Sequence, residues 1–149
     1  MIKTIIFHVE YLCSEEKIIR KIELLENQTL DDLHEAIIYK AFGWDDPHMY
    51  SFFMDNKAYS QNRKMEYHCD PDGEMEFFNE GKPNSSNTKL KELNLKKKQK
   101  FLFIFDFGDD HMFSIRVHDF SEAKKETKYP VIIEEIGKAP EQYEYFEDK

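Results

Sequence analysis

The amino-acid sequence predicts an α+β domain, with a mostly antiparallel, β-grasp-like sheet and one main helix packed on a face. Residues 2–25 and 101–117 each alternate apolar and polar positions around a short polar turn, which is typical of β-hairpins. Between them, residues 29–43 carry apolar side chains at helical spacing. The order of two strands, one helix and further strands favours an α+β fold.

In the first hairpin, the apolar side chains of residues 5, 7, 9 and 11 share one strand face, and Ser14–Lys17 supplies the turn. The helix is expected to begin after Thr29, the predicted N-cap, with Asp32 in the capping-box position. Gly43 is a C-cap signal. Trp44, directly after it, is expected to anchor the end of the helix to the sheet.

A third strand is predicted over residues 48–54, followed by a protruding hairpin over residues 65–77 that turns at Asp70–Gly73. Residues 80–88 have loop composition. The second long hairpin should place Phe101, Phe103, Phe105 and Phe107 on the buried face of a central strand. A last strand is expected over residues 129–133, and residues 134–149 are interpreted as a mobile acidic tail of a single domain spanning residues 1–149.

The composition narrows the range of possible functions. The chain has 149 residues, 15% of them aromatic, and a net charge of −9. That charge argues against direct binding to nucleic acid or to an anionic membrane. Six lysines between residues 89 and 100 are better explained as a solvated turn, because no aromatic or arginine residues accompany them. No apolar run is long enough to span a membrane, and Cys13 and Cys69 form no paired motif, so a cytoplasmic location with reduced thiols is expected.

Two acidic turns carry histidines, Asp45–His48 and Asp106–His111. If their strands are neighbours, carboxylates and imidazoles would form a joint cluster suited to a divalent metal such as zinc or manganese. The candidate ligand or metal residues are Asp46, His48, Asp109 and His111, with Asp106 as a further member of the cluster. Trp44 and Tyr50 are the candidate aromatic wall, which would also suit a small cationic ligand. The alternative, favoured by turn statistics, is that these residues only cap backbone groups and that Gly108 supplies a left-handed position.

Other catalytic patterns are missing from the sequence, and no catalytic residue is predicted. His34-Glu35 begins like a zincin helix, but Ile38 occupies the position of the second histidine, so His34 is expected at the helix surface or edge. The serines lack a nucleophile-elbow context, and five glycines could hardly build a phosphate cradle.

The chain contains three characteristic segments, in the order LHEAIIYKAFGWDDPHMYSF, FDFGDDHMFSIRV and YPVIIEEIGKAPEQY. Together they resemble the plasmid pRiA4b ORF-3-like family. The similarity extends from the first hairpin to Tyr145. The chain departs from the family pattern in two places. His111 and Phe113 stand where the family usually has Trp and then His, and Ala139–Gln142 lacks a cysteine found in many members. Both departures weaken a retained metal or thiol site.

These observations leave three functions open. A binding or interaction module, for a protein partner or a small cationic ligand, is the leading hypothesis and needs no cofactor. A metal-dependent, hydrolase-like enzyme that uses the acidic turns is the rival. The plasmid and mobile-element contexts of the family imply the third, a nucleic-acid accessory protein.

Overall fold

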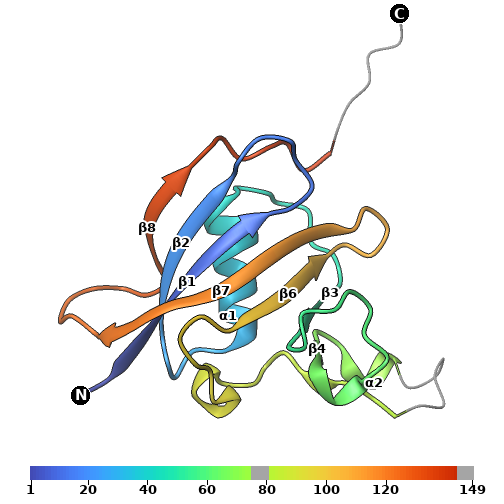
Figure 1. Ribbon diagram of the computed structural model, residues 1–149, viewed down its shortest axis with the longest axis horizontal. Helices are drawn as coiled ribbons and strands as arrows, with labels where there is room; N and C mark the ends of the chain where they lie inside the picture. The colour runs from blue at the N-terminus through green and yellow to red at the C-terminus, as the bar shows by residue number, and fades with distance from the viewer. Residues whose placement is uncertain (75–80, 144–149) are drawn as a thin grey trace, which may run out of the picture.

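The computed structural model describes residues 1–74 and 81–143. Figure 1 shows a twisted sheet with one helix lying across a face. The strands are β1 (Lys3–Tyr11), β2 (Ile19–Leu25), β3 (Tyr50–Phe53), β4 (Glu66–His68), β5 (Asn84–Ser85), β6 (Lys100–Phe105), β7 (His111–Glu122) and β8 (Val131–Ile136). The helical elements are α1 (Leu30–Glu35), its π-helical continuation Ala36–Ala41, the short α2 (Pro71–Glu74), and 3-10 turns at Arg63–Met65 and Leu90–Leu93.

The eight strands form one sheet in the order β5-β4-β3-β6-β7-β1-β2-β8. Every pairing is antiparallel except the short β4–β5 pair, which is parallel. The α+β class, the mostly antiparallel sheet and the single main helix are therefore confirmed. The β-grasp-like topology stays a prediction.

The main helix begins and ends as its sequence indicates. The Thr29 side chain accepts a hydrogen bond from the backbone N–H of Asp32, and the Asp32 carboxylate accepts one from the N–H of Thr29. Gly43 follows the helix with a φ of +70°, a left-handed conformation that glycine adopts without steric cost. The N–H of Trp44 then donates to the carbonyl of Ile38. This helix end directs Trp44, which is 4% exposed, against the end of the sheet.

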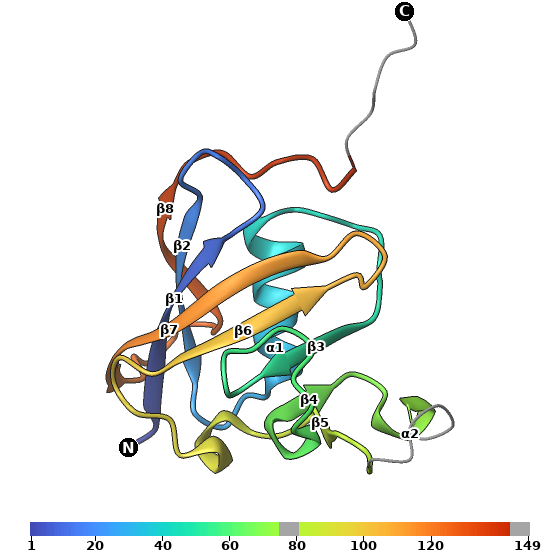
Figure 2. The same ribbon diagram turned by 45° about the vertical axis from the view of Figure 1, so that its right-hand side comes forward.

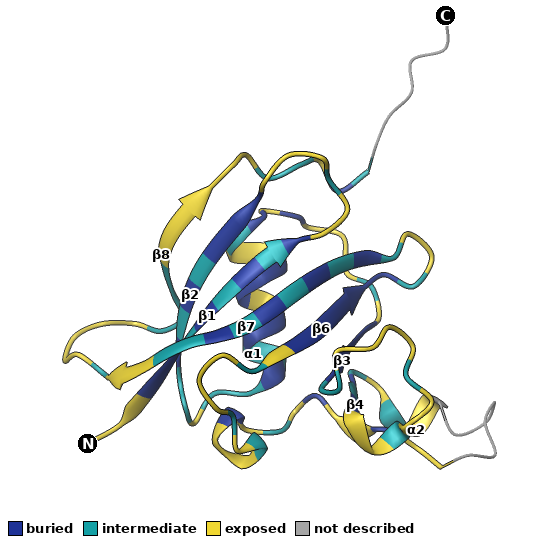
Figure 3. Cartoon of the chain, viewed as in Figure 1, coloured by how far each residue is buried: buried dark blue, intermediate teal, exposed yellow. Residues whose placement is uncertain are grey.

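Strand β6 lies inside the sheet, and its apolar side chains are buried on both faces (Figure 3). Phe101, Phe103 and Phe105 are fully buried in the main core on the helix side. Phe107 does not continue this face. The backbone turns left-handed at Asp106 (φ +65°), which ends the alternation, and Phe107 packs half-buried against a second cluster with Phe53, Leu102, Ile104 and Met112.

The segment predicted as a protruding hairpin has a different structure. Pro71–Glu74 forms the short helix α2 where a tight turn was predicted over Asp70–Gly73. Strand β4 pairs with β3, and Asn84–Ser85, expected in a loop, adds the edge strand β5. Figure 2 shows this region at one end of the sheet. The predicted returning strand, with Met75 and Phe77, lies outside the described residues.

The C-terminal part differs from the prediction of a mobile tail that begins at residue 134. Strand β8 continues to Ile136 and pairs with β2, and the following residues cross the end of the sheet beside the β1–β2 loop (Figure 2). Residues 144–149 of the predicted tail lie outside the described residues. In the part of the chain that the structure describes, no helix has the length and apolar character needed to cross a membrane.

Candidate functional site

The turn between β6 and β7 is built on Asp106. This residue is 8% exposed and adopts a left-handed backbone conformation, as does Asp110 (φ +52°), whereas Gly108 does not. The Oδ1 atom of Asp106 accepts hydrogen bonds from the N–H groups of Gly108 at 3.1 Å and Asp109 at 3.4 Å. Aspartate tolerates this conformation because its short side chain bonds the local backbone. Oδ1 thus stabilises the turn, while the other carboxylate oxygen, Oδ2, lies 3.5 Å from Nε2 of His48.

Three side chains of this hairpin converge. Asp106, Asp109 and His111 each offer a ligand atom, and these atoms all lie within 4.8 Å of one another. Nε2 of His111 is 3.9 Å from Oδ2 of Asp109. Two carboxylates and one imidazole in this arrangement are a ligand set that divalent transition metals accept.

His111 is buried, with 8% of its surface exposed, and a hydrogen bond to one of its ring nitrogens fixes the orientation of the ring. Its Nδ1 is 2.8 Å from the hydroxyl of Tyr11, and its ring centroid is 4.5 Å from that of Trp44. Nε2 has no hydrogen-bond partner among the described residues. Burial lowers the pKa of His111, while the negative charges of Asp109 and Asp106 oppose this shift. The ring is therefore neutral at pH 7.

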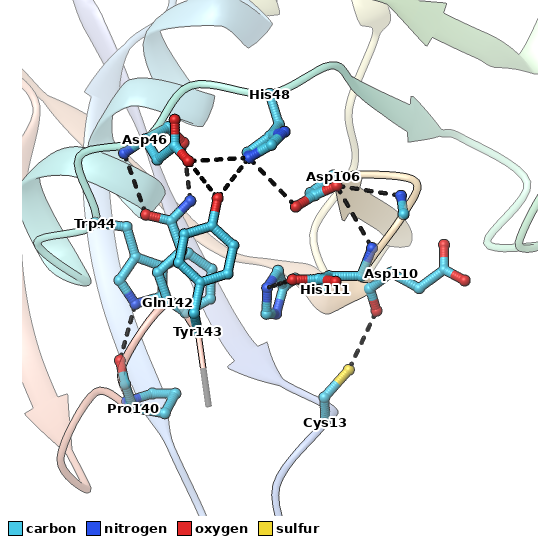
Figure 4. A network of polar contacts seen from close by, with 12 residues as sticks. Cys13, Trp44, Asp46, His48, Asp106, Asp110, His111, Pro140, Gln142 and Tyr143 are labelled. Carbon is cyan, nitrogen blue, oxygen red and sulfur yellow. Dashed lines mark hydrogen bonds and ion pairs between the residues drawn. The ribbon is translucent and has the colours of Figure 1, made fainter. Parts of the chain in front are cut away.

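The second acidic turn meets the first through Asp106 (Figure 4). Nε2 of His48 lies 3.4 Å from Oδ2 of Asp46 and 2.7 Å from the hydroxyl of Tyr143. That hydroxyl donates a hydrogen bond to the Asp46 carboxylate, and this bond raises the pKa of Tyr143 to about 12. Asp46 and His48 thus flank the group formed by Asp106, Asp109 and His111.

The aromatic wall differs from the expectation. Trp44 adjoins His111, but Tyr50 lies away from the cluster, on the helix side of β3. Its hydroxyl donates to Oδ1 of Asp31 at 2.7 Å, and its ring stacks on His34 at 3.7 Å between centroids. Burial raises the pKa of Tyr50. His34 is itself 5% exposed and not a surface residue, because the helical stripe that faces the core includes its position.

Sequence reasoning missed the contributions of Tyr11, Gln142 and Tyr143. The side-chain amide of Gln142 bonds the backbone of Asp46 twice, accepting from its N–H at 3.1 Å and donating to its carbonyl at 2.8 Å. The indole N–H of Trp44 donates to the carbonyl of Pro140 at 2.8 Å. The sequence signal for Gln142 and Tyr143 was a polar and aromatic C-terminal segment, whose composition is equally typical of a solvated tail, and Tyr11 was assigned only to the apolar face of the first hairpin.

A cavity of about 780 Å³ opens beside these groups. Its walls come from the β1–β2 loop, the β6–β7 hairpin and the segment after β8. Asp109 and His111 are part of the lining, so one side of the candidate metal cluster is accessible from a space much larger than a water molecule.

Comparisons with known proteins agree with this description of the fold. The crystal structure of a protein of unknown function from Methanosarcina mazei Go1 is similar, with a TM-score of 0.73 and 23% sequence identity. The match covers 95% of this chain and 74% of the archaeal one, and at this identity it shows the fold alone. No curated protein matches the chain. The family model described as "Plasmid pRiA4b ORF-3-like protein" matches residues 3–143, and the chain therefore belongs to the plasmid pRiA4b ORF-3-like family.

Proposed function

We propose that this protein is a binding module whose ligand is a divalent metal ion, held by Asp106, Asp109 and His111. The observation that carries the proposal is the convergence of their three ligand atoms within 4.8 Å of one another. Ligands about 2.0–2.2 Å from an ion are at most roughly 4.4 Å apart. Side-chain movements of less than an ångström would therefore close this group around a metal.

The surroundings of His111 support its role as a ligand. A metal-bound histidine almost always donates its other ring N–H to a neighbouring acceptor, which fixes the tautomer and the ring orientation. The Tyr11 hydroxyl, 2.8 Å from Nδ1, provides such an acceptor. With Nδ1 protonated, Nε2 presents a lone pair toward the carboxylates. Mixed imidazole and carboxylate ligands favour zinc or manganese.

His48 and Asp46 would support the same site from its flank. His48 is 3.5 Å from Asp106 and can orient that carboxylate, or complete the coordination sphere after a rotation of its ring. Asp46 holds His48 and Tyr143 in place. The net charge of −9 draws cations toward the protein in general and would favour loading of this site.

A metal-dependent hydrolase is the second candidate, and one observation favours it. The cavity of about 780 Å³ reaches Asp109 and His111, so water and a substrate have access to an ion held there. An ion with an open coordination position lowers the pKa of a bound water and makes it a nucleophile. This candidate requires turnover of an ester or phosphoester by metal-loaded protein, with loss of both turnover and metal binding in an Asp109→Asn variant.

A nucleic-acid accessory role has no comparable support, because carboxylates at this end of the sheet would repel phosphates. The β-grasp-like topology and the cytoplasmic location remain expectations. The free thiols of Cys13 and Cys69 are consistent with a reducing compartment.

The proposal is tested by calorimetric titration of zinc and manganese into tag-free protein that has been treated with a chelator. We expect binding of one ion per chain and a rise in melting temperature, with both effects lost in Asp109→Asn and His111→Gln. The matched controls are Asp119→Asn and His118→Gln, which change the same residue types on strand β7, outside the cluster. Absence of heat and of a melting shift in the wild-type protein would refute the proposal.

A further inference from the structure

The segment after β8 is tied to the second acidic turn at several points (Figure 4). The indole N–H of Trp44 donates to the carbonyl of Pro140, and the side-chain amide of Gln142 bonds the backbone of Asp46 twice. Gln142 is 8% exposed, so its two bonds are largely shielded from water. We call Pro140–Tyr143 the C-terminal strap, because these bonds hold it across the end of the sheet.

The path of the chain from β8 into the strap is also fixed. Gly137 directly follows β8 with a φ of +79°, and a Cβ atom at this position would lie 2.2 Å from the carbonyl oxygen of Lys17. Glycine is the residue that permits such a close approach of two backbones. Ala139 then packs against the main core. The backbone of the strap is therefore anchored, and the half-buried ring of Tyr143 at its end is able to move while these anchors hold.

The contacts of the Tyr143 hydroxyl define which atom carries each proton. The hydroxyl donates its single proton to the Asp46 carboxylate, and its pKa, raised to about 12, keeps it protonated at pH 7. Nε2 of His48 lies 2.7 Å from the same hydroxyl oxygen. Because the hydroxyl proton is already committed to Asp46, His48 is the donor in this second bond. The strap therefore holds His48 with a proton on Nε2, the nitrogen that lies 3.5 Å from Asp106.

This hydrogen bond and a bound metal ion exclude each other at His48. A histidine binds a metal through a lone pair, so Nε2 cannot donate to Tyr143 and coordinate an ion at the same time. Zinc usually takes four ligands, and the group of Asp106, Asp109 and His111 supplies three. Once Tyr143 is displaced, the ring of His48 can carry its proton on Nδ1 and present the lone pair of Nε2 to the ion.

We propose that Tyr143 is a gate on the metal site: its hydroxyl holds His48 through Nε2, and a bound ion displaces it and recruits His48 as the fourth ligand. The inference rests on the proposed metal site and adds how loading of that site is regulated. The hydroxyl competes with the ion for one nitrogen, so the strap lowers the affinity for metal. Tyr143 shares the cavity lining with Asp109 and His111, which leaves space for its ring to move.

The first test compares the zinc affinity of chelator-treated, tag-free wild-type protein with that of a Tyr143→Phe variant by calorimetric titration. The variant lacks the competing hydroxyl and should bind zinc about three- to tenfold more tightly, the range that corresponds to one net hydrogen bond. The matched control is Tyr129→Phe, which removes a hydroxyl that accepts a hydrogen bond from the backbone N–H of Lys124, outside the cluster and the cavity. Its zinc affinity should equal that of the wild type.

A double-mutant cycle tests whether the gain acts through His48. His48→Gln should weaken zinc binding, and Tyr143→Phe added to it should have no further effect. In the wild type, NMR should show Nε2 of His48 changing from a protonated to a metal-bound nitrogen as zinc is added. Melting curves check that all variants are folded.

The proposal would be overturned by equal affinity of Tyr143→Phe and the wild type, or by an equal gain in the Tyr129→Phe control. A gain that persists in the His48→Gln background, or an unchanged Nε2 resonance of His48 at saturating zinc, would also overturn it. Absence of zinc binding in the wild type and in every variant would instead refute the metal site itself, and the gate with it. The two failures are therefore distinguishable.

Discussion

Three histidines are buried in the described part of the chain, and two of them, His34 and His111, differ clearly in their surroundings. His34 is 5% exposed, and neither of its ring nitrogens has a hydrogen-bond partner among the described residues. It lies in the aromatic core, stacked on Tyr50 and 5.7 Å from the ring of Phe105. His111 is 8% exposed, bonded to Tyr11 through one nitrogen, and borders carboxylates and a cavity.

This difference shows that an unpartnered histidine nitrogen is not by itself the sign of a ligand site. Among the described residues, His34 belongs to no group of three acidic, histidine or cysteine side chains close enough to hold an ion, and its ring serves as an aromatic packing element. His111 combines an oriented ring, two nearby carboxylates and access from the cavity. The candidate site is therefore identified by the surroundings of the histidine, and substitutions in the two regions should have different effects.

The largest effect is expected from the core around His34. Phe103 is fully buried, its ring stacks on Phe52 at 4.5 Å, and it lies 6.0 Å from the ring of His34. Phe103→Ala should lower the free energy of unfolding by about 3–5 kcal/mol, because it leaves a cavity in a close-packed core. Urea denaturation measures this change. Phe120→Ala, at a position 40% exposed, is the control and should cost less than about 1 kcal/mol. Equal stability of the Phe103 variant and the wild type would contradict the packing described.

A pH-dependent effect of intermediate size is expected from His34. Burial lowers its pKa to about 4, from 6.5 for an unperturbed histidine. Between these values the unfolded chain binds more protons than the folded one, so stability falls as the pH falls from 6.5 toward 4, by up to about 3 kcal/mol. The lowered pKa of His111 adds a further loss of stability as the pH falls.

Denaturation at several pH values separates the two contributions. His34→Phe should reduce the slope of stability against pH, and His118→Phe, at a less buried position, should leave it as in the wild type. A His34→Phe variant with an unchanged slope would show that this ring is not held neutral by the core.

The smallest effect on stability is expected in the acidic cluster. The side chains of Asp46 and Asp109 are 52% and 49% exposed. Asp46→Asn combined with Asp109→Asn should change the free energy of unfolding by less than about 1 kcal/mol, as is usual for surface positions, while metal binding is abolished. If the double variant is strongly destabilised and the wild type binds no metal, the two carboxylates are structural.

Much of the fold could be predicted because its signals are local. The period-two alternation before residue 106, the capping box at Thr29 and Gly43 after the helix each depend on near neighbours in sequence, and each is found in the structure. Phe107 was assigned to the wrong face because a left-handed Asp106 ends the alternation. Aspartate adopts that conformation seldom enough that the pattern did not reveal it.

The candidate site was only half predictable. The two acidic turns were evident as residue clusters, and neighbouring strands β3 and β6 bring them together. Tyr11, Gln142 and Tyr143 were missed because they reach the cluster through contacts across about a hundred residues. Tyr50 was misplaced because its sequence position is close to His48, whereas its ring lies on the helix side of the sheet.

The central claim, that His111 and not His34 is a metal ligand, is tested most directly by NMR of the histidine ring nitrogens during titration with zinc. We expect the Nε2 resonance of His111 to shift and to saturate at one ion per chain, while both nitrogens of His34 stay unchanged. An unchanged His111 resonance at stoichiometric zinc, or an equal response of His34, would contradict the account.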